Sequence, residues 1–154
     1  MTKINLDKLQ ASKVGPIEDI IADVPLPNGS LVAIEEAVAG ERELQKVKTP
    51  AAEDEVLLVA TVEMRYDTVY ADQLDYTLPV GEVGRAYHLT NGDKFQVERS
   101  MFEVEPVKDT VYAVNPATLG YKVATNERVT FVAEQLTLFG YAKTPMVRLR
   151  VLTV

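Results

Sequence analysis

Hydrophobic and polar residues alternate along several short segments of the chain, as is typical of β-strands that bury one face. The clearest segment is 146–151, where Val147, Leu149 and Val151 point to one side and two arginines point to the other. Residues 55–63 instead form a nearly continuous apolar run, which predicts a central strand covered on both faces. Further strands are predicted at residues 30–34, 41–48, 100–105, 110–114 and 121–123.

The segment 129–139 is ambiguous, because its apolar spacing also fits a capped helix. Its Val, Thr and Phe content favours a strand. Short strands joined by Gly, Pro and Asn turns predict an all-β fold, a compact antiparallel β-sandwich or barrel formed by residues 28–154.

Residues 84–97 have the pattern of a β-hairpin. A three-residue loop at Thr90-Asn91-Gly92, with Gly92 in the left-handed conformation, would place Tyr87 opposite Phe95. A two-residue loop would shift the register by one and separate these rings. We therefore predict the three-residue loop, since paired aromatic side chains stabilise neighbouring strands.

Residues 1–27 contain prolines at a spacing that disfavours regular structure, so we predict an extended N-terminal arm in front of the β domain. Pro16 at a first helical position, followed by isoleucines at helical spacing, predicts a short helix at 16–22. A helix this short needs a surface to dock on, and we favour another protein over the chain's own body. The predicted contacts are Ile17, Ile20 and Ile21.

A long aromatic segment follows the central strand, from residue 64 to residue 83. Loops of this length often carry function. Its tyrosines suit a protein interface, because each has an apolar ring and a polar tip, but they equally suit a cover over the chain's own core. The candidate partner-binding residues here are Tyr66, Tyr70 and Tyr76.

Composition limits the possible chemistry. The chain has 154 residues, no cysteine and a net charge of −7. Disulfides and thiolate chemistry are therefore excluded, and an acidic chain without a basic cluster is not expected to bind nucleic acid. The apolar runs are too short to span a membrane, and no secretory signal pattern opens the sequence.

The sequence carries no motif that predicts catalysis. His88 is the only histidine, and we interpret it as a structural residue of a strand. The acidic stretch 53–55 lacks the ligand spacing and the glycine of a calcium loop, which indicates a solvated loop. We therefore predict no enzyme activity, no catalytic or metal-binding residue and no cofactor. A hydrolase or lyase that uses acidic residues remains the least favoured alternative.

Several segments together resemble the small head-decoration, or cement, proteins of tailed bacteriophages. They are Leu26–Val32, Val56–Val62, Arg85–Leu89, Gly92–Phe95 and Val111–Val114. The resemblance is one of layout over most of residues 26–154. It implies a β domain on the outer capsid surface, with an N-terminal extension that reaches over neighbouring subunits.

The resemblance thus implies a virion structural protein, made in the host bacterial cytoplasm, that binds the major capsid protein and stabilises the shell. Copies of the chain itself are a further candidate partner. The alternative is a β-module for ligand or carbohydrate recognition, with the tyrosine segment as its site.

Overall fold

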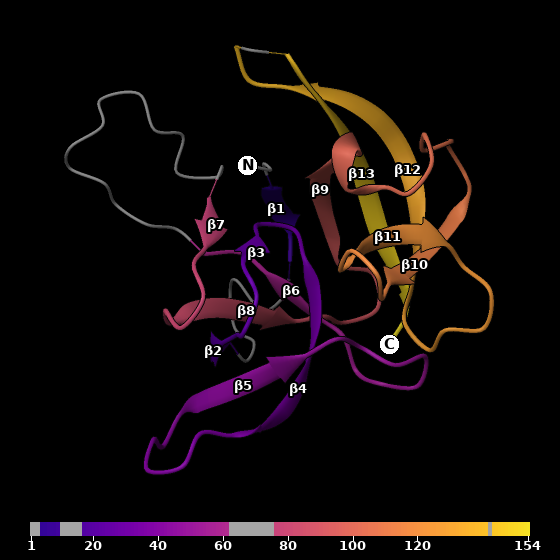
Figure 1. Cartoon of the computed structure of the whole chain (residues 1–154). Helices are drawn as coiled ribbons and strands as arrows, with labels where there is room; N and C mark the ends of the chain where they lie inside the picture. The colour runs from indigo at the N-terminus through magenta and orange to yellow at the C-terminus, as the bar shows by residue number, and fades with distance from the viewer. Residues whose placement is uncertain (1–3, 10–16, 62–75, 142) are drawn as a thin grey trace.

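Two β-structures stacked against each other make up the molecule (Figure 1). The computed structural model describes residues 4–9, 17–61, 76–141 and 143–154. Within these residues the secondary structure consists of strands and one short 3-10 helix, η2 (Arg99–Met101), so the all-β prediction is confirmed. No helix in the described ranges is long and apolar enough to cross a membrane.

The first structure is a closed five-stranded barrel in the order β2-β5-β4-β6-β8. Neighbouring strands are antiparallel except for the parallel pair β2–β5. A short two-stranded sheet, β3–β7, accompanies the barrel. The bounds are β2 Ile17–Ile21, β3 Leu26–Pro27, β4 Leu31–Ala37, β5 Leu44–Lys48, β6 Leu57–Val59, β7 Thr77–Leu78 and β8 Gly84–His88.

The second structure is a six-stranded antiparallel sheet in the order β1-β9-β13-β12-β10-β11. Its bounds are β1 Ile4–Lys8, β9 Lys94–Glu98, β10 Val111–Asn115, β11 Gly120–Val123, β12 Thr130–Phe139 and β13 Thr144–Thr153. As predicted, Val147, Leu149 and Val151 of β13 face the core. The ambiguous segment 129–139 is a strand, because it pairs with β13 along nearly its whole length.

Two hydrophobic cores follow from this arrangement. One includes Val32, Val59 and Ala86 of the barrel strands, whereas the other joins Leu31 and Leu58 to the inner face of the six-stranded sheet. Neighbouring residues of one barrel strand therefore belong to different cores, as expected where side chains alternate between two faces. β6, which lies within the predicted central strand, is buried on both faces: Leu58 belongs to one core, and Leu57 and Val59 belong to the other.

The N-terminal segment differs from the prediction. Its described residues are extended, but they pair with the body instead of leading away from it: β1 with β9, and β2 with both β5 and β8. The helix predicted at 16–22 is wrong, because Ile17–Ile21 is β2. β-branched isoleucines suit a strand, and β2 completes the barrel, which outweighs a helical spacing of only two turns.

The predicted hairpin at 84–97 is also wrong. The turn exists, with Gly92 at a φ of 88° and a hydrogen bond from the Asp93 N–H to the Thr90 carbonyl. However, β8 pairs within the barrel and β9 pairs with β1 and β13, so the turn connects two sheets. Tyr87 and Phe95 both lie in the shared core but are not cross-strand partners.

The strand predicted at 100–105 is absent. Residues 99–101 form η2, and Phe102 makes only an isolated bridge to Tyr121. The aromatic ring of Phe102 is nevertheless in the core, where it stacks on Tyr121 with ring centroids 5.0 Å apart. Ring burial, together with one backbone hydrogen bond from the Glu103 N–H to the Tyr121 carbonyl at 2.9 Å, therefore holds this segment.

Candidate docking surface of the barrel

The three isoleucines predicted to bind a partner have different environments on β2. The side chain of Ile20 is fully buried inside the barrel, with an exposed fraction of 0%. Ile17 is 43% exposed and Ile21 is half-buried, because alternate residues of a strand face opposite sides. Ile20 is therefore a core residue, and only Ile17 offers substantial apolar surface.

The three predicted tyrosines also differ from one another. Tyr66 and Tyr70 lie outside the described residues. Tyr76 packs in the barrel core and is 8% exposed. Its carbonyl accepts a hydrogen bond from the Asn28 N–H at 2.9 Å, so the residue joins the end of this segment to the turn before β4.

The structure brings the end of the N-terminal segment beside the end of the tyrosine segment. β3 and β7 pair through Leu26 and Leu78, and the Gly81 N–H donates to the Ala22 carbonyl at 3.2 Å. Two segments that the sequence suggested as separate contact regions thus meet at one end of the barrel.

Three exposed valines lie on these adjoining segments, and we call them the barrel-end surface. Val24 is 49% exposed, Val80 55% and Val83 57%. Val24 and Val80 belong to the two chain segments that flank the Leu26–Leu78 pair. Sequence reasoning missed this surface, although valines beside Pro25 and Pro79 in turn sequence were a usable signal.

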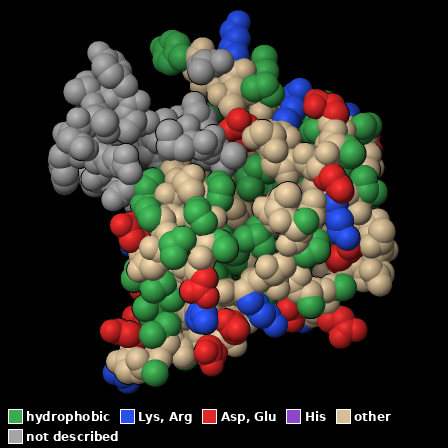
Figure 2. All heavy atoms as spheres, viewed as in Figure 1, with side chains coloured by type: hydrophobic (Ala, Val, Ile, Leu, Met, Phe, Trp, Pro, Cys, Tyr) green, Lys and Arg blue, Asp and Glu red, His purple; other side chains and the backbone are tan. Residues whose placement is uncertain are grey.

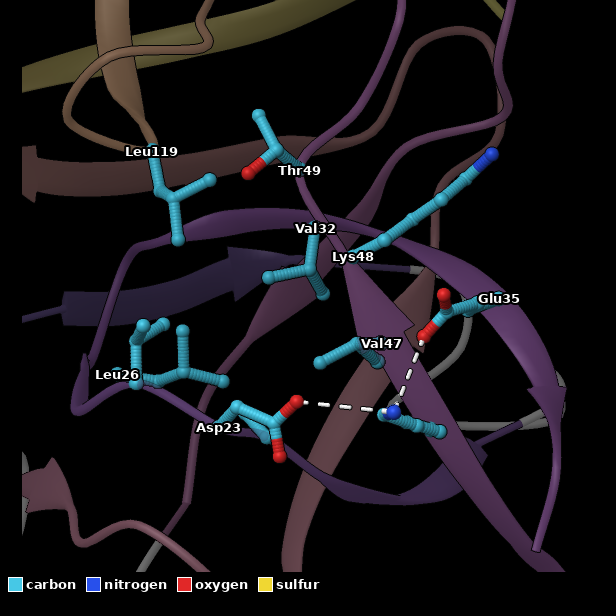
Figure 3. Close-up of a pocket in the computed structure, with 11 residues that line it drawn as sticks. Asp23, Leu26, Val32, Glu35, Val47, Lys48, Thr49 and Leu119 are labelled. Atoms are coloured by element: carbon cyan, nitrogen blue, oxygen red, sulfur yellow. Dashed lines mark ion pairs between the residues drawn. The ribbon is translucent and has the colours of Figure 1, made fainter.

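A cavity of about 270 Å³ lies next to Val24 (Figure 3). Its apolar wall includes Leu26, Val32, Val47 and Leu119. The parallel pairing of β2 with β5 ends at Ile21 and Lys46, and residues on both sides of this end line the cavity.

Charged groups stand at the edge of this cavity. The Lys46 ammonium lies 3.6 Å from a carboxylate oxygen of Asp23 and 3.7 Å from one of Glu35 (Figure 3). These two charges raise the pKa of Lys46 above its usual value. All three side chains are substantially exposed, so the ion pairs contribute little stability and leave the charges accessible.

His88 is held between two carboxylates elsewhere on the barrel. Its Nδ1 lies 2.8 Å from Glu55 and its Nε2 lies 3.1 Å from Glu18 on β2. Burial alone lowers the pKa of His88, but its hydrogen bonds and charge interactions with the two glutamates outweigh burial and raise it.

The two ring nitrogens of His88 contact different carboxylates. His88 therefore links β8 to Glu18 on β2 and to Glu55 before β6, and the three side chains do not converge on one ion. Among the described residues, no three acidic or histidine side chains come together as a metal-binding cluster.

Comparison of the chain with protein-family models, with curated proteins and with solved structures found no match in any of the three.

Proposed function

We propose that this chain is a virion structural protein that binds the major capsid protein on the outer surface of a tailed-phage head and stabilises the shell. The layout resemblance in the sequence motivates the proposal. The barrel-end surface, with three exposed valines on two adjoining segments, is the observation that supports it. Exposed apolar groups that lie together are typical of protein-binding surfaces.

In the proposed attachment the N-terminal segment is part of the folded barrel and does not reach out as a separate arm. Ile20 is buried in the barrel, so the N-terminal segment contributes through Val24, and Ile17 adds further apolar surface on β2. The contact is modest for a single copy, so linkage between copies would raise their effective affinity for a repeating surface.

A pair of charge substitutions tests the proposal. Val80→Asp with Val83→Asp should lower the occupancy of purified phage heads about tenfold or more, because carboxylates would replace apolar contacts. Both positions are more than half exposed, so the variant should remain folded. Occupancy is measured by quantitative gel analysis of heads separated from unbound protein.

The matched control is Val104→Asp with Val107→Asp, two valines that are 53% and 60% exposed elsewhere on the surface. This control should decorate heads like the natural sequence. Full occupancy by the Val80/Val83 variant would refute the barrel-end surface as the attachment site, and failure of the natural sequence to bind any head would refute the function itself.

The cavity favours a second candidate function, recognition of a small ligand such as a carbohydrate. Its apolar wall and its accessible Asp23, Glu35 and Lys46 offer both packing and hydrogen bonding. Binding on a glycan array that is lost in Asp23→Ala would support this function. Equal binding by the two proteins would exclude the cavity as the site.

A further inference from the structure

The hairpin formed by β12 and β13 extends past the strands that flank it (Figure 1). β9 pairs with β13 only over Met146–Arg150, and β10 pairs with β12 only at Phe131 and Val132. Hydrogen bonds to residues 109 and 110 cover β12 as far as Ala133. Beyond that point, no strand in the described part of the chain pairs with the outer edge of β12.

We call the end of the hairpin, residues 135–146, the ribbon; the structure describes all of its residues except Ala142. Its inner face continues the face that forms the core, because Leu136 lies opposite the fully buried Val147 and Leu138 lies opposite Pro145. Yet Leu136 is 39% exposed and Leu138 is 62% exposed, since the hairpin has passed the edge of the body. Tyr141 in the turn is also exposed.

The ribbon differs from the rest of the chain in charge. Its 12 residues contain no Asp or Glu and a single Lys143, whereas the whole chain has 23 acidic residues and a net charge of −7. Figure 2 shows the end of the hairpin, at the top of the view, with hydrophobic side chains and a cation. Two copies of the chain carry the same net negative charge and therefore repel each other, but the ribbon contributes no negative charge to this repulsion.

We infer that the ribbon pairs with the ribbon of a second copy, edge to edge and antiparallel, to form a two-fold dimer. With Thr137 opposite its own equivalent, Leu136 of each copy lies opposite Leu138 of the other. Four leucines then share one face, where cross-strand apolar pairs stabilise a sheet. An isologous contact of this kind closes on itself and satisfies the open edge of β12.

The pairing also avoids opposed like charges. In the same register Glu134 lies opposite Gly140, and the Glu134 carboxylate is already bound by Lys94 at 3.2 Å and Arg150 at 3.3 Å. The Thr137 hydroxyl donates to Gln96 at 3.0 Å on the outer face of the sheet, which leaves the inner face to the leucines. In this register the leucines of the two copies therefore face each other, and no like charges are opposed.

Sedimentation equilibrium over a range of concentrations tests the inference. The natural chain should pass from 17.0 kDa to twice that mass as its concentration rises. Leu138→Lys places a charge in the centre of the contact and should raise the dimer dissociation constant about tenfold or more. Val107→Lys, at a 60% exposed valine outside the ribbon, is the matched control and should dimerise normally.

Hydrogen exchange identifies the contact independently. Amides of residues 135–139 should exchange more slowly as the dimer forms, and circular dichroism should show that Leu138→Lys remains folded. A 17.0 kDa species at every concentration, or a dimer that Leu138→Lys leaves intact, would overturn the inference. Neither sedimentation nor hydrogen exchange involves phage heads. A negative result for the dimer therefore leaves the proposed function untouched, and the reverse also holds.

Discussion

The N-terminal strands and the C-terminal hairpin contrast in a way that reverses the sequence-based expectation. Residues 1–27 were expected to reach outward, yet Ile4 and Ile20 are 1% and 0% exposed. Residues 129–139 and 146–151 were predicted as strands of the β domain, with no pairing assigned to them, yet Leu138 at the end of the hairpin they form is 62% exposed. A strand is buried when neighbours cover both of its edges and one of its faces, whatever its apolar content.

Pairing explains the contrast. β2 has β5 on one side and β8 on the other, whereas within the described ranges only β13 pairs with the end of β12. The N-terminal segment therefore closes a barrel. The end of the hairpin, although it carries apolar residues, extends beyond the strands that flank it. The predictions below test this difference, from the largest expected effect to the smallest.

Deletion of residues 1–21 should abolish cooperative folding. The truncation removes β1 and β2, opens the barrel between β5 and β8, and exposes side chains such as Ala86 and Val47 that are now buried. Far-ultraviolet circular dichroism and urea unfolding measure the outcome. A truncated chain with an unchanged unfolding transition would show that these strands are not part of the folded body.

Ile20→Ala should lower the free energy of unfolding by about 2–4 kcal/mol, because it leaves a cavity in a closed core. Leu138→Ala should change it by less than about 0.5 kcal/mol, since the same kind of side chain is solvated there. Urea titration at low protein concentration, where the chain is monomeric, provides both values. Similar losses in the two variants would contradict the contrast between the regions.

The third prediction concerns the pH dependence of the His88 bridge to β2. The folded pKa of His88 is raised above its ordinary value of 6.5, so the protonated ring stabilises the fold. This contribution is complete below pH 6.5 and is lost as the pH rises through the folded pKa. His88→Gln should remove about 1 kcal/mol at pH 6 and much less at pH 9.

Urea unfolding of both proteins at the two pH values measures this difference. An equal loss at pH 6 and pH 9 would mean that His88 acts through packing and not through its charge.

Much of the strand content was predictable from local pattern. The alternation at 146–151 correctly indicated a half-covered strand, and the apolar run at 55–63 indicated a fully covered one, which is observed at Leu57–Val59; residues 62 and 63 lie outside the described residues. Two predictions from local pattern were wrong, the helix at 16–22 and the hairpin at 84–97, because the same turn or apolar spacing is compatible with more than one structure. The turn at Gly92 was recognised correctly, but a turn does not determine whether its two strands pair with each other or enter different sheets.

The candidate docking residues were likewise only partly predictable from local pattern. Ile17 was selected from the sequence for a helical spacing that β2 does not have, whereas Val24, Val80 and Val83 were missed. Their exposure depends on the pairing of β3 with β7, which is two residues long and joins positions about 50 apart in the chain. Valines beside Pro25 and Pro79 were a local signal for exposed apolar turns, but no local pattern encodes the β3–β7 contact that brings them together.

By itself, the sequence determined that the chain forms β-strands, where most of them lie and which of their faces is apolar, because these properties follow from the alternation of side chains along an extended backbone. The tertiary structure alone decided which strands are neighbours, that β2 closes a barrel, and that no third strand of the described part of the chain pairs with the end of the β12–β13 hairpin. Strand pairing joins residues far apart in the chain, and its energy depends on the whole set of partners rather than on any one segment.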